Sequence, residues 1–164
     1  GQGAGQPMTA RLTTGWMTSI PLLVMITLIL NLPGHANGHD GATGIVKKRH
    51  DSMNMLRHTM KSWAAGLKAG QVPDQVAIAK ISSRLSAGAG PRLLALFQES
   101  GSHDKSDALP IIWTRWDAFE DLAMTLEEQA LSLMTSRADL DAQRSALKGV
   151  AQVCRECHDQ FRKR

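Results

Sequence analysis

Apolar residues recur at alternating steps of three and four along most of the chain beyond residue 44. The first run consists of Val46, Arg49, Met53, Leu56, Met60, Trp63 and Leu67. Residues with this spacing lie on one face of an α-helix. Arg49 is the one charged residue in the run, and Gly70 followed by Val72 and Pro73 ends the pattern. We therefore predict a helix from residue 45 to Gly70, with Arg49 on its apolar face.

A second and shorter helix is predicted after Asp74, because an aspartate before an apolar run is suited to cap the first backbone N–H groups of a helix. Its apolar positions are Ile78, Ile81 and Leu85. Glycine and proline in the stretch 88–91 end it. From Gly90 to Leu109 we predict a loop of about 20 residues, a length that is typical of functional or flexible loops.

Two more helical runs follow. One opens at Pro110, which suits a first helical turn, and continues with Ile112, Trp116, Phe119, Ala123, Leu126, Ala130 and Leu133. The other begins at or beside Asp139 and continues with Leu140, Gln143, Leu147, Val150, Cys154, Cys157 and Phe161. Four helices that each carry one apolar face predict an all-α fold, an antiparallel four-helix bundle.

The beginning of the chain has the pattern of a secretory signal peptide. Arg11 precedes an apolar run over Ile20–Leu32, and small residues at positions 34 and 36 are typical of a cleavage site. The apolar run, about 13 residues long, is shorter than the roughly 20 residues that span a membrane. The pattern predicts export and cleavage near Ala36, and an uncleaved membrane anchor is the alternative.

These patterns divide the chain into three parts. We predict an N-terminal extension and signal peptide over 1–36, a glycine-rich linker over 37–44 and a four-helix domain over 45–164. The cleaved protein is then expected in the periplasm, without a stable membrane span.

Composition narrows the classes of protein that fit. With 43% hydrophobic and 21% charged residues, the chain is globular, and its two cysteines exclude a scaffold of several disulfides. Lysine and arginine number 19 against 15 acidic residues, a mild excess that is spread along the chain. No aromatic residues alternate with the basic ones, so we do not expect nucleic-acid binding.

One motif carries chemistry, the pentapeptide Cys154-Arg155-Glu156-Cys157-His158 on the last predicted helix. Its two cysteines are three residues apart and its histidine is four after the first cysteine, so all three lie on one side of the helix. Such a unit can hold a haem, because each thiol can add to a vinyl group and the imidazole can coordinate the iron. The motif predicts haem c on the C-terminal helix, one per chain and covalently attached.

Other interpretations of the cysteine pair are less well matched. A thioredoxin-type pair requires a βαβ unit, a zinc site requires a fourth ligand, and a disulfide between Cys154 and Cys157 is sterically poor within a helix. A helical adaptor with a haem-free redox switch stays open, and a colourless protein would identify it. No arrangement of nucleophile and general base is present, so we do not predict an enzyme.

A four-helix bundle with Cys-x-x-Cys-His near the end of the sequence resembles the class II cytochromes c, which comprise cytochrome c′ and its low-spin relatives. Val46–Arg49 followed by Met53 is similar to the family's opening helix. Asp107–Trp113 resembles the start of its third helix, and Cys157–Arg162 resembles its closing stretch. The resemblance extends over residues 45–164.

The resemblance implies roles for several residues. His158 would be the proximal iron ligand, and Arg49 would bind the haem propionates through paired hydrogen bonds, with His50 at the same edge. Asp107 would lie near the haem edge. Arg162 would lie close to the proximal histidine, where it could tune the basicity of the imidazole.

Met53 lies one helical turn after Arg49, at the position that in the family covers the open face of the iron. In the low-spin branch a methionine there is the distal ligand, whereas in cytochrome c′ an apolar side chain leaves the iron five-coordinate. Some high-spin members also carry methionine, and a methionine can equally fill a core.

Two functions follow from these alternatives. With Met53 as ligand, the protein is an electron carrier whose iron cycles between the ferric and ferrous states and whose partners are redox proteins. With Met53 as a packing residue, it is a five-coordinate haem protein that binds nitric oxide or carbon monoxide. The resemblance also leaves a homodimer open.

Overall fold

The computed structural model describes residues 44–98 and 105–164. The predicted signal peptide over 1–36 and nearly all of the predicted linker lie outside the described residues, so their predictions stay untested. None of the helices in the described part of the chain is long and apolar enough to cross a membrane.

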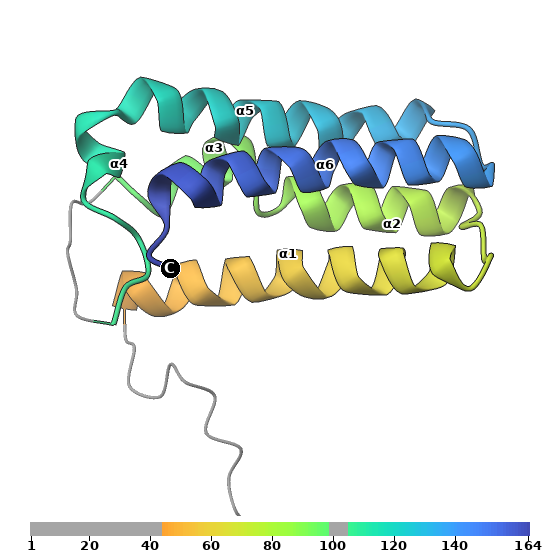
Figure 1. Ribbon diagram of the computed structural model, residues 1–164, viewed down its shortest axis with the longest axis horizontal. Coiled ribbons are helices and arrows are strands. Elements are labelled where there is room, and N and C mark those ends of the chain that lie inside the picture. The colour runs from red at the N-terminus through yellow and green to blue at the C-terminus, as the bar shows by residue number, and fades with distance from the viewer. Residues whose placement is uncertain (1–43, 99–104) are drawn as a thin grey trace, which may run out of the picture. The chain divides into compact units, whose positions relative to one another are not determined.

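Four long helices form the bundle that the apolar pattern predicts (Figure 1). They are α1 (Gly44–Lys68), α2 (Gln75–Ser86), α5 (Trp116–Ser132) and α6 (Leu140–Phe161). Helix α1 packs on α2 and α6, and α5 packs on the same two helices, so α1 and α5 are diagonally opposed. The predicted antiparallel four-helix bundle is confirmed.

The ends of the long helices follow from local side-chain chemistry. Asp74 caps α2 by accepting a hydrogen bond from the Ala77 N–H at 2.8 Å, and Asp139 caps α6 through the Ala142 N–H at 2.9 Å. After α1 the chain turns at Gly70, whose φ of 74° is the left-handed conformation that glycine adopts without steric strain.

The predicted loop from Gly90 to Leu109 contains a short helix, α3 (Gly90–Ala95), so that prediction is wrong in its first third. Pro91 stands in its first turn, where a missing N–H has no cost. Leu93 and Leu94 are buried, and α3 packs on α5. Six residues are too few to show a helical period, which is why the sequence pattern missed this element.

The third predicted helix is also interrupted. A short helix α4 (Ile111–Thr114) follows Pro110, and α5 starts afresh at Trp116. Between them Arg115 has φ −124° and ψ 46°, outside the helical region. Its guanidinium reaches the Gln160 side chain on α6 at 3.1 Å, so the break allows this segment to contact the end of α6. A short 3-10 helix, η1 (Leu133–Thr135), follows α5.

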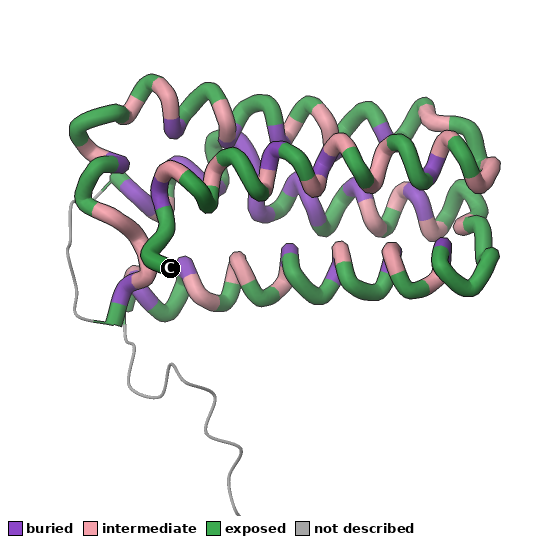
Figure 2. Tube along the Cα trace, viewed as in Figure 1, coloured by how far each residue is buried: buried purple, intermediate pink, exposed green. Residues whose placement is uncertain are grey.

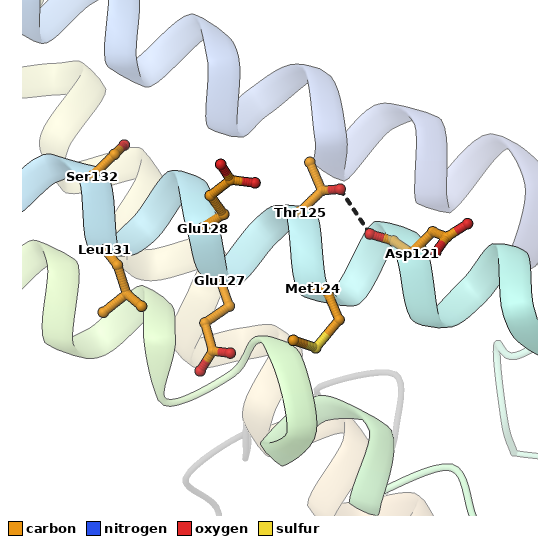
Figure 3. A pocket seen from close by; sticks show the side chains of 7 residues that line it. All are labelled: Asp121, Met124, Thr125, Glu127, Glu128, Leu131 and Ser132. Atoms are coloured by element: carbon orange, nitrogen blue, oxygen red, sulfur yellow. Dashed lines mark hydrogen bonds between the residues drawn. The ribbon is translucent and has the colours of Figure 1, made fainter.

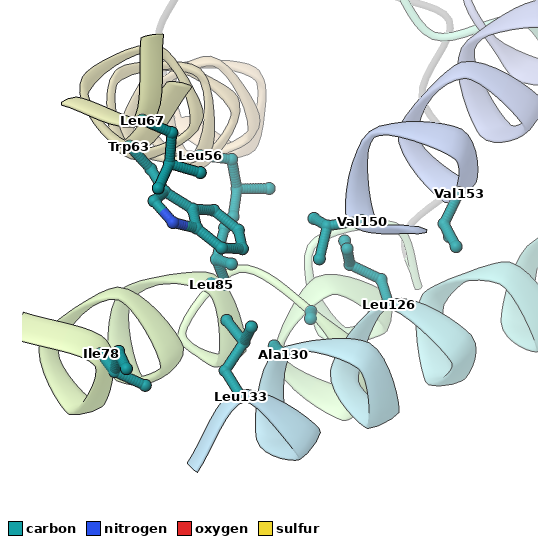
Figure 4. Close-up of a cluster of buried hydrophobic side chains, with 11 residues drawn as sticks. Leu56, Trp63, Leu67, Ile78, Leu85, Leu126, Ala130, Leu133, Val150 and Val153 are labelled. Atoms are coloured by element: carbon teal, nitrogen blue, oxygen red, sulfur yellow. The ribbon is translucent and has the colours of Figure 1, made fainter. Parts of the chain in front are cut away.

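Figure 2 shows buried residues on the sides of the helices that face one another. The buried hydrophobic side chains form two clusters. The first, here called the large cluster (Figure 4), comprises Leu56, Trp63, Leu67, Ile78, Leu85, Ala89, Leu126, Ala130, Leu133, Val150 and Val153. The second, the aromatic cluster, comprises Leu93, Leu94, Phe97, Ile112, Phe119, Ala123 and Phe161. Met53 on α1 and Leu122 on α5 are partly buried against both clusters, and thus mark their boundary.

Candidate functional site

The motif on α6 lies across the boundary between the two clusters. Both cysteines are free thiols and half-buried; Cys154 packs against the large cluster and Cys157 against the aromatic cluster. His158 follows as an exposed residue. The helix therefore places two thiols against the interior, and the histidine that follows them is exposed.

Burial changes the acidity of these groups. It raises the pKa of Cys157 to about 11, with a further contribution from the neighbouring Cys154, and it raises the pKa of Cys154 as well. Cysteines that act in redox exchange have lowered pKa values instead. Although His158 is exposed as a residue, partial desolvation of its imidazole lowers its pKa, and the Arg162 cation lowers it further while Asp159 opposes the shift.

Met53 approaches the same boundary from α1, the helix that packs against α6. Two thiols and a thioether from two adjacent helices thus border an apolar interior, and the His158 imidazole stands beside the thiols on α6. This donor set fits a covalently held haem: cysteine sulfur for the vinyl groups, and nitrogen and sulfur for the iron. Within the described residues, no three His, Cys, Asp or Glu side chains form a cluster that could hold a metal ion by themselves.

Arg49 does not extend to solvent, since only 3% of the residue is exposed. Its Nε donates a hydrogen bond to the Leu96 carbonyl at 2.7 Å. The guanidinium carbon lies 4.6 Å from the ring centre of Phe97 and 5.7 Å from that of Trp113. Stacking on aromatic faces and a backbone acceptor thus hold this cation inside the bundle. His50, the next residue along α1, is half-buried.

Asp107 and Arg162, predicted separately, are in contact. Arg162 Nη2 lies 3.3 Å from Asp107 Oδ2. The Lys163 N–H donates to the Asp107 carbonyl at 2.8 Å, and the Leu109 N–H donates to the Phe161 carbonyl at 2.9 Å. We call these paired segments, residues 107–109 and 161–163, the clasp. The sequence pattern missed it, because two short segments that pair through backbone groups carry no periodic signal.

The aromatic cluster connects the clasp to Arg49. The ring of Phe161 lies 5.5 Å from that of Phe119, and Phe119 lies 5.0 Å from Phe97, on which Arg49 stacks. The structure therefore gathers the predicted haem-edge residues around one end of the bundle, where α6 carries its motif. They are Arg49, His50, Asp107 and Arg162.

Comparison with known proteins decides the family. A family model described as Cytochrome C′ matches residues 44–162, which is most of the chain. The chain belongs to the cytochrome c′ family. The sequence-based resemblance to class II cytochromes c is thereby confirmed.

Individual relatives agree with this assignment. Cytochrome c-554 of Cereibacter sphaeroides is 26% identical over 152 residues, covering 90% of this chain and 99% of that protein. A variant of the cytochrome c′ of Rhodopseudomonas palustris has a TM-score of 0.67 at 27% identity, covering 75% of this chain and all of the other. A nitric oxide complex of a cytochrome c′ variant from Alcaligenes xylosoxidans has a TM-score of 0.59 at 23% identity, covering 73% of this chain and 94% of the other.

Members of the cytochrome c′ family bind covalently attached haem c, and this chain carries the two cysteines that such attachment requires. The predicted cofactor is thus confirmed at the level of the family.

Proposed function

We propose that the chain is an exported electron carrier in which Cys154 and Cys157 form the thioether bonds to haem c. In this proposal the His158 imidazole and the Met53 thioether would hold the iron. The predicted signal peptide supports a periplasmic location.

The observation that carries the proposal is the position of Met53. Its side chain borders both apolar clusters, and the two thiols of α6 border one cluster each. Met53 is the only methionine among the described residues that packs against both clusters; Met55 and Met60 pack against the large cluster alone. The helix that holds this thioether packs against α6, which carries His158.

The chain's own residues would give the bound group its properties. Haem iron supplies a one-electron couple between its ferric and ferrous states. The thioether sulfur of Met53 would favour the ferrous state, and the apolar side chains of both clusters, against which Met53 packs, would exclude water from around it. Arg49, His50, Asp107 and Arg162 are proposed to border the haem edge.

Exposed basic residues support a partner of opposite charge. Lys47 and Lys48 lie at the start of α1, and Lys163 and Arg164 follow α6. All four are exposed and flank the end of the bundle where the clasp and the motif lie. Such a basic edge steers an acidic redox protein toward the haem.

Gas binding is the second candidate function. The relative from Alcaligenes xylosoxidans was solved with nitric oxide bound, so this fold accommodates a diatomic ligand in that protein. Under this alternative Met53 is an apolar side chain that crowds the distal face and leaves a coordination position for nitric oxide or carbon monoxide.

The visible spectrum of the reduced holoprotein, recorded before and after addition of carbon monoxide, separates the two functions. The electron-carrier proposal expects a sharp low-spin spectrum that the gas leaves unchanged, because His158 and Met53 would leave no coordination position for the gas. A broad high-spin spectrum that shifts on adding the gas would instead support the gas-binding function.

Haem attachment is tested separately by mass spectrometry of the intact protein. Cys154→Ala and Cys157→Ala should each abolish the normal attachment of haem through two thioether bonds. Replacing the exposed Arg155 between the two cysteines should leave haem attachment intact. A Cys154→Ala or Cys157→Ala protein with unaltered covalent haem and an unaltered spectrum would contradict the assignment of the site.

A further inference from the structure

Helix α5 presents an acidic solvent face that carries no basic side chain. Its acidic residues are Asp117, Glu120, Asp121, Glu127 and Glu128. Large apolar side chains stand exposed among and beyond them, namely Met124 (42% exposed), Leu131 (53%) and Met134 (52%). Exposed apolar side chains that gather on one face, next to charged groups, are typical of an interaction surface.

This face is hollowed. A hollow of about 700 Å³ is lined by Asp121, Met124, Thr125, Glu127, Glu128, Leu131 and Ser132 (Figure 3). A second hollow, of about 460 Å³, is lined by Ala79, Ser82, Ser83, Ser86, Ala87, Arg92, Glu127, Leu131 and Met134. Glu127 and Leu131 line both hollows, so the two adjoin along α5, and together they are here called the α2–α5 groove. Figure 3 shows Met124, Glu127 and Leu131 on the side of α5 that faces α2 and α3.

The floor of the groove consists of small side chains. Ala79 and Ser83 of α2, and Ala87 directly after it, leave room for another chain to approach closely. Ser86, which lines the same part of the groove, is only 8% exposed.

The negative charge on α5 is only partly balanced, and Figure 3 shows Glu128 on the side of α5 away from α2 and α3. Glu127 lies 3.7 Å from Arg92, and its carboxylate packs over Gly90, where a Cβ would come within 2.2 Å of Oε2. Glu127 therefore has a structural role. Among the described residues, neither the Asp121 nor the Glu128 side chain forms an ion pair, so both remain available to a basic partner.

We propose that the α2–α5 groove docks a basic amphipathic helix of a partner protein. Apolar side chains of that helix would contact Met124, Leu131 and Met134, and its lysines or arginines would pair with Asp121 and Glu128. Helices fit such grooves through side chains spaced three and four apart, and methionine adapts to varied apolar partners. Because α5 is diagonal to α1, docking here leaves the face between α1 and α6 uncovered. The inference is independent of which ligand occupies the iron.

Calorimetric titration of the holoprotein with two synthetic helical peptides tests the proposal. One peptide has leucines on one face and lysines on the other, and the second has the same length and charge but alanine in place of every leucine. We expect the leucine–lysine peptide to bind at least ten-fold more tightly than the alanine–lysine peptide, with affinity that falls as salt is added.

Two pairs of matched variants locate the binding. Leu131→Asp should lower the affinity for the leucine–lysine peptide about ten-fold, even though the substitution adds negative charge. Val76→Asp should leave that affinity unchanged, because exposed Val76 does not line the groove. The double variant Asp121→Lys/Glu128→Lys should bind the peptide far more weakly than the double variant Asp51→Lys/Asp141→Lys. Both double variants change the net charge equally, and the second does so at exposed positions outside the groove. Circular dichroism and the haem spectrum verify that each variant is folded.

Equal affinity for the two peptides would overturn the proposal, as would equal effects of the matched variants. A second copy of the chain is the competing occupant, and sedimentation analysis identifies it. If the holoprotein forms a dimer that Leu131→Asp dissociates and Val76→Asp does not, the groove is a self-association surface and the proposal of a basic helical partner is wrong.

Discussion

The Arg162 guanidinium lies 3.3 Å from the Asp107 carboxylate, although 54 residues separate them in the sequence. The pair closes the clasp, in which two backbone hydrogen bonds also join residues 107–109 to residues 161–163. Helix α6 ends in the same turn, where the Arg162 N–H donates to the His158 carbonyl at 3.1 Å. The clasp therefore fixes the helical turn that begins at His158.

Removing the ion pair should loosen this turn without unfolding the protein. Both side chains are about half exposed, so Asp107→Asn should reduce the free energy of unfolding by no more than about 1 kcal/mol. Amide hydrogen exchange at residues 161–163 should nevertheless become faster, because local opening no longer breaks the ion pair. Exposed Asp117→Asn is the matched control, and equal exchange in the two variants would show that the pair does not stabilise the turn.

The large cluster should account for much of the bundle's stability. Leu85 on α2 is 1% exposed, so Leu85→Ala should lower the free energy of unfolding by about 2–5 kcal/mol through lost burial and a residual cavity. Val76→Ala on the same helix truncates an exposed side chain and should change the free energy of unfolding by less than about 0.5 kcal/mol. Chemical denaturation of the two variants measures both values, and similar losses would contradict the described burial.

Arg49 should not tolerate replacement by lysine, although the charge is kept. Lysine has no planar guanidinium to stack on Phe97 and Trp113 and no Nε–H to donate to the Leu96 carbonyl. We expect Arg49→Lys to destabilise the fold by about 1–2 kcal/mol. Exposed Arg57→Lys on the same helix is the control, and denaturation curves that coincide for the two variants would argue against the stacked arrangement.

The helices were predictable because their information is local and periodic. The apolar spacing and the caps at Asp74 and Asp139 correctly predicted α1, α2 and α6. The break at Arg115 was not predictable, because neither proline nor glycine marks it and the contact with Gln160 is long-range.

In the candidate site, too, local features were predictable from the sequence and long-range contacts were not. The motif from Cys154 to His158 is contiguous, so the sequence alone indicated its chemistry. The stacking of Arg49 on two aromatic rings and the pairing of Asp107 with Arg162 join segments that are distant in the chain. Periodicity carries no information on such contacts, which form only when the bundle packs.

Asp139 should make stability depend on pH at the acidic end. Its pKa is lowered, mainly because its carboxylate accepts the Ala142 N–H at the start of α6, and Arg137 contributes. A lowered pKa in the folded state means that the stabilisation is present above the unfolded-state value near 3.8 and is lost as the pH falls through the folded-state value. Thermal melts should show Asp139→Ala to be less stable than wild type at pH 6, with the difference shrinking in acid. A difference that is constant with pH would contradict this role of the carboxylate.

The position of Met53 between the two clusters is best tested by a pair of methionine variants. In the reduced holoprotein, Met53→Ala should convert a low-spin spectrum that is insensitive to carbon monoxide into a high-spin spectrum that shifts when the gas is added. Met60→Ala, which removes a methionine from the large cluster alone, should keep the wild-type spectrum and its insensitivity. If Met53→Ala and wild type have the same spectrum and the same response to the gas, Met53 is not an iron ligand and the electron-carrier proposal loses its central support.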